Sequence, residues 1–133
     1  MAASKTYLVP VDFSKGSRIA LRHAMELARR KKGKLLLVHV VPLVVQMGTV
    51  SSFLRGELEA MARHFGLKPA EYRLLVLERG DAARAIADLA KKFRVAMIIM
   101  GSHGATGLRR FILGSVAERT LRYAECPVLI VKR

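Results

Sequence analysis

Two glycine-containing segments late in the chain have the spacing of a phosphate-binding loop. The first runs from Gly101 to Gly104, and nine residues separate it from the second, Gly114-Ser115. Glycine lets the backbone turn sharply and bring bare N–H groups against a ligand, and the N-terminus of a helix adds further N–H groups. An apolar run, 95–100, precedes the first segment, and a helix-like run follows the second. This pattern predicts an anion site and favours a phosphate as its ligand.

The loop between the two segments should wrap around the ligand. The residues that we expect to line it are Gly101, Ser102, His103, Gly104, Ala105, Thr106 and Gly107. Ser115 has two interpretations: as an N-cap its hydroxyl stabilises a helix by about 1 kcal/mol, and it can also contact a phosphate. Arg109 and Arg110 either reach a polyphosphate or remain solvated.

A second set of polar residues follows the first apolar run of the chain. Pro10 and Val11 lead into Asp12 and then Ser14. A carboxylate at that position either accepts a hydrogen bond from a base or ribose hydroxyl, helps to hold Mg²⁺ near a phosphate, or caps the following helix. We therefore expect Pro10, Val11 and Asp12 to belong to the same site as the glycine segments.

The sequence favours binding over turnover. It has no GxxxxGK[ST] segment, so the lysine that serves the β- and γ-phosphates in P-loop NTPases is missing. No carboxylate besides Asp12 is placed to activate water, and His103 has no triad spacing around it. The lone Cys126 and the scattered histidines form no metal-ligand pattern, and His39 is interpreted as a core histidine. We expect hydrolysis to be slow or absent, and any Mg²⁺ to arrive with a nucleotide.

The elements that position these residues alternate along the chain. Helix-like runs separate five continuously apolar or β-branched runs, and such runs are typical of parallel strands buried on both faces. The predicted strands are Tyr7–Val11, Lys34–Val41, Tyr72–Leu77, Val95–Met100 and Val128–Lys132, with a longer loop around 42–50. Parallel neighbours need crossover connections, so the fold class is α/β: one doubly wound, Rossmann-like parallel sheet of five strands with helices on both faces.

Helix boundaries agree with this reading. Gly33 and Gly66 are placed as C-terminal caps, Asp81 as the N-cap of a helix that begins at Ala82, and 115–118 as a capping box.

The placement of the polar loops predicts the strand order. Open parallel sheets bind ligands beyond the carboxyl ends of their strands, where the order reverses. The loops 10–12 and 101–104 share one crevice if the order is 3-2-1-4-5. The last strand then lies at an edge, and an unpaired edge invites pairing with a second copy. We expect a homodimer through this strand, whose residues are Val128, Leu129, Ile130 and Val131.

Length and charge limit the remaining possibilities. A chain of 133 residues fits one domain, 1–133, and its longest apolar stretch is shorter than the about 20 residues of a membrane span. We expect no membrane association and a cytoplasmic location. The net charge of +14 is spread evenly, because residues 1–66 and 67–133 each contribute +7. With few aromatic residues to stack on bases, only weak and non-specific nucleic-acid binding is expected.

Five segments together resemble the universal stress protein family: 10–14, 37–40, 101–104, 114–119 and 126–131. The resemblance covers nearly the whole chain, and its G-x2-G-x9-G-[ST] motif is that of the ATP-binding branch. It implies that Pro10, Asp12 and Val40 line the adenine and ribose side, that Met100 and Gly101 form the strand end, and that the loop through Gly107 and the segment Gly114, Ser115 and Val116 hold the phosphates. It also implies cytoplasmic homodimers that act in stress survival or regulation.

Three hypotheses about function follow. The leading one is an ATP-binding regulatory or stress-survival protein whose output is conformational or through a partner, with at most slow ATP hydrolysis. The alternatives are a slow ATPase or other nucleotide hydrolase, and a basic nucleic-acid-binding module.

Overall fold

The computed structural model describes residues 5–41, 47–103 and 113–132. Five parallel strands form one sheet in the order β3-β2-β1-β4-β5, as the sequence predicts. The elements in chain order are β1 Thr6–Pro10, α1 Lys15–Lys31, β2 Lys34–Val41, α2 Met47–His64, a 3₁₀ turn Pro69–Glu71, β3 Tyr72–Glu78, α3 Ala82–Lys92, β4 Met97–Gly101, α4 Ser115–Tyr123 and β5 Val128–Val131.

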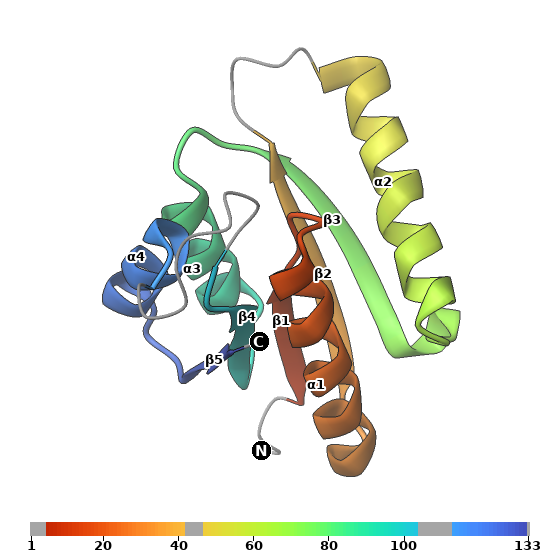
Figure 1. Cartoon of the computed structure of the whole chain (residues 1–133), viewed down its shortest axis with the longest axis horizontal. Helices are drawn as coiled ribbons and strands as arrows, with labels where there is room; N and C mark the ends of the chain where they lie inside the picture. The colour runs from red at the N-terminus through yellow and green to blue at the C-terminus, as the bar shows by residue number, and fades with distance from the viewer. Residues whose placement is uncertain (1–4, 42–46, 104–112, 133) are drawn as a thin grey trace.

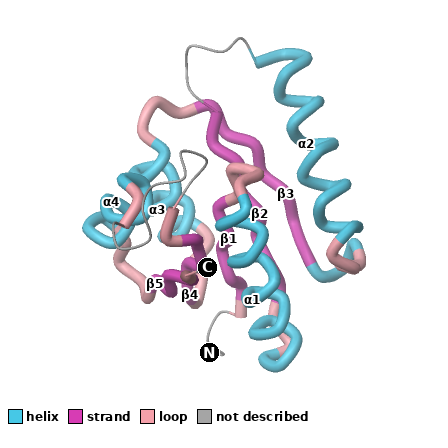
Figure 2. The backbone as a smooth tube through the Cα atoms, viewed as in Figure 1, coloured by secondary structure: helices cyan, strands magenta, loops and turns pink. Residues whose placement is uncertain are grey.

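The helices cover both faces of the sheet (Figures 1 and 2). On one face α1 and α2 pack on alternate strand residues such as Val9 and Leu37. On the other face α3 and α4 pack on the intervening residues, such as Leu8 and Leu36. Because neighbouring residues of β1 and β2 enter different cores, both strands are continuously apolar in sequence.

The predicted start of α3 is confirmed and that of α4 is not, while α1 is capped by Ser14 and not by Asp12, one of the alternatives that the sequence left open. The Asp81 carboxylate caps α3 by accepting from the N–H of Arg84, and Ser14 caps α1. The predicted capping box at 115–118 is wrong, because Gly114 is the N-cap and Ser115 is already the first residue of α4. The Ser115 hydroxyl makes no capping bond, which leaves it available at the start of the helix.

The helix ends also differ in part from expectation. Gly66 takes a left-handed φ of 82°, as its predicted capping role requires. After α1, however, Lys32 takes the left-handed conformation instead of Gly33. Gly33 is needed for a different reason: a Cβ there would lie 2.2 Å from the carbonyl oxygen of Lys5. The loop expected around 42–50 is shorter than predicted, because α2 begins at Met47.

Three further properties bear on function. No helix in the described part of the chain is long and apolar enough to cross a membrane. The described residues contain no group of three or more metal-binding side chains. Cys126 is half-buried, and burial raises the pKa of its thiol above the ordinary value, consistent with the inert thiol that its position beside Pro127 suggests.

Candidate functional site

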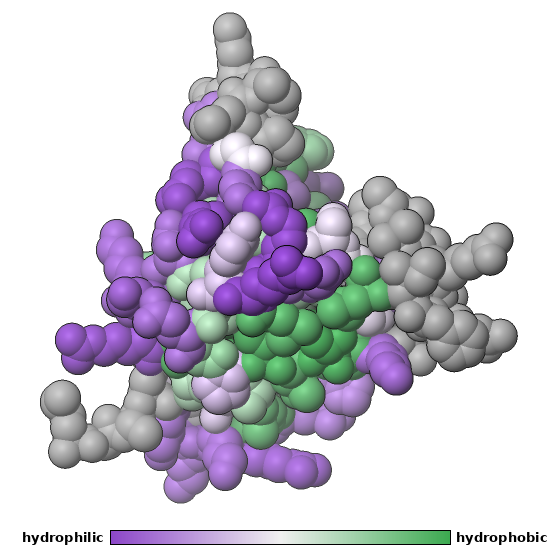
Figure 3. Space-filling view, turned by 90° about the vertical axis from the view of Figure 1, so that its left-hand side faces the viewer, coloured by the Kyte–Doolittle hydropathy of each residue, from purple (hydrophilic) through white to green (hydrophobic). Residues whose placement is uncertain are grey.

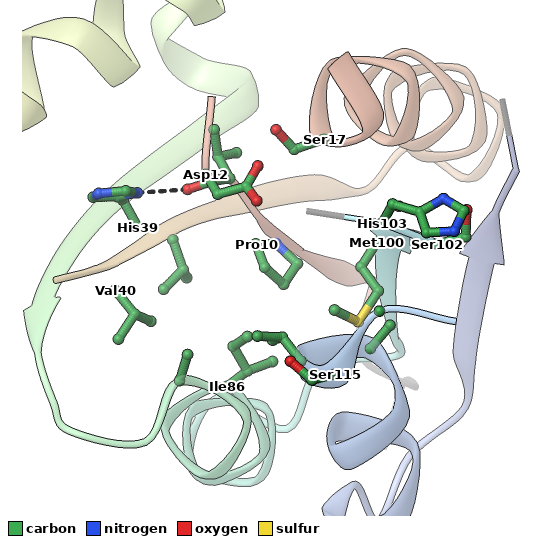
Figure 4. Close-up of a pocket in the computed structure, with 17 residues that line it drawn as sticks. Pro10, Asp12, Ser17, His39, Val40, Ile86, Met100, Ser102, His103 and Ser115 are labelled. Atoms are coloured by element: carbon green, nitrogen blue, oxygen red, sulfur yellow. Dashed lines mark hydrogen bonds between the residues drawn. The ribbon is translucent and has the colours of Figure 1, made fainter. Parts of the chain in front are cut away.

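A cavity of about 220 Å³ opens at the carboxyl edge of the sheet, among the ends of β1, β2 and β4 and the first turns of α3 and α4 (Figure 4). This is the edge at which the strand order reverses between β1 and β4. The residues that line the cavity are Pro10, Val11, Asp12, Ser17, Val38, His39, Val40, Ala82, Ile86, Met100, Gly101, Ser102, His103, Gly114, Ser115, Val116 and Ala117.

Every predicted site residue that the structure describes lies on the wall of this cavity. These residues are Pro10, Val11, Asp12, Val40, Met100, Gly101, Ser102, His103, Gly114, Ser115 and Val116. The predicted loop residues Gly104, Ala105, Thr106 and Gly107 lie outside the described residues, as do Arg109 and Arg110. The fold therefore brings residues that are far apart in sequence, 10–12, 40, 100–103 and 114–116, to one place.

The two glycine segments are joined directly by a backbone hydrogen bond. The N–H of Gly114 donates to the carbonyl oxygen of Ser102 at 2.7 Å. The N–H of Ser102 in turn donates to Val131 at the end of β5, at 3.1 Å. The N-terminus of α4 therefore lies beside the end of β4.

A second close contact fixes the position of α1 on this loop. A Cβ on Gly101 would lie 2.8 Å from the backbone carbon and oxygen of Gly16, and a Cβ on Gly16 would lie 2.6 Å from the carbonyl oxygen of His103. Real Cβ atoms do not approach backbone atoms so closely. Gly101 is therefore required for packing α1 against β4, in addition to any approach to a ligand.

Two residues of β2 hold the turn that carries Asp12, because they hydrogen-bond to the backbone N–H and carbonyl oxygen of Val11. The N–H of Val11 donates to Val38 at 2.7 Å. The carbonyl oxygen of Val11 lies 2.6 Å from Nδ1 of His39, and since a carbonyl oxygen can only accept, Nδ1 carries the proton (Figure 4). Phe13, next in the chain after Asp12, takes a left-handed φ of 64°, and its ring packs 5.0 Å from the ring of His39.

These contacts orient the carboxylate of Asp12. A non-glycine residue with left-handed φ costs about 1–3 kcal/mol and persists only where its surroundings impose it. The contacts of Val11, Phe13 and His39 impose it here. Within the turn, Oδ1 of Asp12 accepts from the N–H of Ser14 at 3.0 Å, which holds the exposed carboxylate at the mouth of the cavity.

A cluster of charged and aromatic side chains ties α3 to α4 beside the cavity. Asp81 pairs with the guanidinium of Arg119, which also donates to the hydroxyl of Tyr123 at 3.3 Å. The guanidinium of Arg84 lies 3.9 Å above the Tyr123 ring. The N–H of Arg84 and the nearby Arg119 hold the pKa of Asp81 below its ordinary value. Because both helices supply cavity residues from their first turns, this cluster sets the width of that side of the cavity.

The wall combines an apolar part with a polar rim. Val38, Val40, Ile86 and Met100 form a surface that suits a flat ring system. On the rim, Asp12 can accept hydroxyl hydrogen bonds, and the start of α4 at Ser115 offers N–H groups and a hydroxyl to an anion. Ser102 and His103 hydrogen-bond to one another through Oγ and Nδ1 at 3.2 Å.

Six cavity residues were not predicted: Ser17, Val38, His39, Ala82, Ile86 and Ala117. The sequence could have indicated Ala82, because it follows the predicted N-cap Asp81 at the start of a helix. In a parallel sheet, every strand-to-helix connection lies at the carboxyl edge, where the cavity is. Ile86 and Val38 are indistinguishable in sequence from ordinary core residues. His39 is hydrogen-bonded, as a core histidine should be, but it is only half-buried and forms part of the cavity wall.

Comparison with known proteins agrees with this architecture. Residues 4–132 match the model of the universal stress protein family. Universal stress protein MJ0531 of Methanocaldococcus jannaschii is 33% identical, over 97% of this chain and 82% of its own. The solved structure of protein MJ0577 is 29% identical and superposes with a TM-score of 0.79 over 99% of this chain and 98% of its own. A universal stress protein of Archaeoglobus fulgidus, solved in complex with dAMP, is 25% identical, with a TM-score of 0.73 over 99% of this chain and 100% of its own. The chain belongs to the universal stress protein family.

Proposed function

We propose that this chain binds ATP, with Mg²⁺ carried by the nucleotide, in the cavity at the carboxyl edge of the sheet. The observation that carries the proposal is the hydrogen bond from Gly114 to Ser102, which joins both halves of the glycine motif at the N-terminus of α4. Phosphate groups bind well at such a helix start because its N–H groups have no partners within the helix. The dAMP complex of the related A. fulgidus protein supports an adenine nucleotide as the ligand.

The proposed pose follows the chemistry of the wall. The adenine ring lies against Val40 and the neighbouring apolar residues, and Asp12 accepts from the ribose hydroxyls. The phosphates lie toward Gly101, Ser102, Gly114 and Ser115, with the predicted contacts at Gly104 to Gly107 completing that side. The bound Mg²⁺ supplies charge neutralisation of the phosphates.

We propose that the output is a nucleotide-dependent regulatory or stress-survival role, without turnover as the primary activity. Among the described wall residues, the titratable side chains are Asp12, His39 and His103. Nδ1 of His39 is engaged with Val11, and Nδ1 of His103 with Ser102. This arrangement suits a binding pocket better than a general base with free access to water.

We further propose a homodimer formed through β5, in the cytoplasm. The N–H groups of Ile98 and Ser102 donate to Pro127 and Val131, so the alternation along β5 directs the N–H of Ile130 to the outer edge. Leu129 and Leu121 are 41% and 44% exposed on this side. Figure 3, which views the molecule from the side of α4 and β5, shows an apolar area bordered by hydrophilic side chains.

Two experiments test these proposals separately. Mass spectrometry of small molecules released from the denatured protein should detect an adenine nucleotide; a protein that releases none and takes up none from ATP and Mg²⁺ would contradict the proposed ligand. Light scattering should give the mass of a dimer for the wild type and of a monomer for Ile130→Pro, which removes one edge donor. A monomeric wild type at micromolar concentration would contradict the proposed assembly.

A further inference from the structure

Among the described residues, the positive charge gathers at one end of the molecule, opposite the cavity. In a parallel sheet, every crossover helix ends at the edge where the next strand begins. The last turns of the four helices, the connections that follow them, the first two residues of each strand and Lys5 therefore share one end, which we call the basic pole. In Figure 1 its part formed by the ends of α1 and α2 and the starts of β1, β2 and β3 lies at the lower end of the molecule.

Lysines and arginines outnumber acidic residues strongly at the basic pole. Its acidic residues are Glu71 and Glu125. Its basic residues, all of them exposed, are Lys5, Arg29, Arg30, Lys31, Lys32, Lys34, Arg63, Lys68, Arg73, Lys91, Lys92, Arg94 and Arg122.

The opposite end is nearly balanced. Its described residues, in the strand ends, the strand-to-helix connections and the first helical turns, are the basic Lys15, Arg18, Arg79, Arg84 and Lys132 and the acidic Asp12, Glu78, Asp81 and Glu118. The charge that is even along the sequence is therefore uneven in space among the described residues.

The centre of the basic pole is a row of cations along the amino edge of the sheet. The N–H of Lys34 donates to the carbonyl oxygen of Lys5 at 2.8 Å, so these two residues are neighbours. Arg94 precedes β4. The start of β4 is held beside β1 by a hydrogen bond from the N–H of Ala96 to the carbonyl oxygen of Thr6, at 2.8 Å. Arg73, the second residue of β3, lies on the other side of β2, opposite Leu36 and therefore two residues further along the sheet than Lys34. Neighbouring strands lie about 4.8 Å apart, so Arg73, Lys34, Lys5 and Arg94 extend over about 14 Å in the direction perpendicular to the strands.

Few of these cations are neutralised within the described part of the chain. Ion pairs engage three of them: Arg29 with Glu71, Lys91 with Glu125, and Arg122 with Glu118. Basic residues in the last turn of a helix offset the helix dipole, which accounts for Arg29 to Lys31. That explanation does not extend to the cations at the strand starts. Their mutual repulsion would be relieved by an external polyanion.

The row lacks the features that would favour a bilayer or single-stranded nucleic acid. Membrane-surface binding uses apolar anchors, and single strands are held by aromatic stacking. Among the exposed large apolar side chains of the described residues, Val50 and Phe53 lie on the first half of α2, and Val116 lies at the cavity. Leu121 and Leu129 lie at the end of the pole formed by α4 and β5, apart from the row of cations on β3, β2, β1 and β4. A set of lysines and arginines without such anchors suits the phosphate backbone of a duplex, which is contacted without reading bases.

We infer that the basic pole binds the phosphate backbone of double-stranded nucleic acid, without sequence preference and independently of the cavity. The two sites lie at opposite edges of the sheet, so a nucleotide and a duplex bind together. The interaction releases counterions and therefore weakens steeply with salt. It does not depend on the proposed ATP binding, because no cavity residue belongs to the pole.

Two triple variants of equal net charge test the inference. Arg30→Gln, Lys31→Gln and Lys34→Gln remove charge from the pole, at side chains that form no ion pair within the described residues. Lys15→Gln, Arg18→Gln and Lys132→Gln remove the same charge from the other end. Circular dichroism confirms that each variant is folded, and fluorescence anisotropy with a labelled DNA duplex of mixed sequence measures affinity from about 50 to 200 mM salt.

The expected result is a difference between the two triples. Each phosphate contact contributes about 0.9 to the slope of log affinity against log salt, so the pole triple should lower the slope by about 2 to 3, and the control triple should leave it nearly unchanged. ATP with Mg²⁺ at matched ionic strength should not displace the duplex. Equal losses in both triples, displacement by ATP, or binding to anionic vesicles with none to the duplex would overturn the inference.

Discussion

Nδ1 of His39 lies 2.6 Å from the carbonyl oxygen of Val11, the residue immediately before Asp12. This hydrogen bond links the third-last residue of β2 to the turn that carries the cavity's carboxylate. It makes His39 a positioning residue for Asp12, acting together with the ring contact to Phe13. The site is therefore preorganised from β2, and its geometry depends on a residue that resembles an ordinary core histidine in sequence.

Removing this donor should weaken nucleotide binding. We expect His39→Ala to lower ATP affinity about fivefold, the equivalent of one hydrogen bond of about 1 kcal/mol. His39→Asn serves as the control, because an asparagine amide can donate from a position close to that of Nδ1 and should restore most of the affinity. Calorimetry measures both. If Asn and Ala reduce affinity equally, positioning through Val11 is not the role of His39.

An acidic side chain at the start of α4 should weaken ATP binding without lowering the stability of the fold. Ser115 is exposed and is the first residue of α4. Ser115→Asp should keep or slightly raise stability, because a negative charge favours a helix N-terminus. It should lower ATP affinity about tenfold or more, since like charges a few ångströms apart repel by about 1 kcal/mol even in water and by more near a protein surface.

Ser115→Ala is the matched control for that substitution. It removes the hydroxyl and adds no charge, so the loss of affinity should be clearly smaller than for Ser115→Asp. Thermal unfolding checks that all three proteins are folded. Wild-type affinity in the Asp variant would mean that the phosphates do not approach α4.

The contact between Gly16 and Gly101 predicts a stability effect that is independent of any ligand. Gly101→Ala places a Cβ 2.8 Å from the backbone of Gly16 and should lower the free energy of unfolding by about 1–3 kcal/mol. Gly56, exposed within α2, has no atom within 4 Å of a built Cβ, so Gly56→Ala should instead stabilise by about 0.5–1 kcal/mol. Urea unfolding distinguishes the two. Stabilisation by Gly101→Ala would show that α1 does not pack closely on β4.

The pairing of Asp81 with Arg119 predicts a pH-dependent contribution to stability. The pKa of Asp81 is lower in the folded chain than its ordinary value, first because of the N–H of Arg84 and then because of Arg119. Such a carboxylate stabilises the fold above its ordinary pKa, and the contribution is lost as pH falls through the lowered pKa. Asp81→Asn, which retains a good N-cap, should therefore unfold at a lower temperature than wild type at neutral pH.

This difference should disappear in acid, where Asp81 is protonated in the wild type. Asp88→Asn breaks the exposed pair with Arg79 and should change the unfolding temperature little at either pH. Calorimetric scans at neutral and acidic pH make the comparison. A constant difference between wild type and Asp81→Asn at every pH would exclude the charge as its cause.

The sequence predicted the sheet well because strand signals are local. The runs around Leu8 and Leu36 are apolar at every position, and only burial on both faces of a parallel sheet explains this. The cavity residues were found where glycine or a carboxylate broke an apolar pattern, as at Asp12 and Gly101. Contributions from ordinary core types, such as Val38 and Ile86, depend on which strand ends meet in space and leave no local signal.

One prediction failed because it depends on where the backbone turns. The capping box at Ser115 was expected from residue types, but the backbone turns one residue earlier, at Gly114. Charge that is even along the chain is a similar case, because parallel topology collects the described helix ends at one edge of the sheet. Both features depend on three-dimensional placement that residue spacing does not determine.

Isothermal titration calorimetry of the wild-type chain with ATP and Mg²⁺ tests the central claim most directly. The account predicts saturable binding of one nucleotide per chain, which Ser115→Asp weakens about tenfold or more while remaining folded. Absence of saturable binding to nucleotide-free wild type, or equal affinity in the wild type and Ser115→Asp, would contradict it.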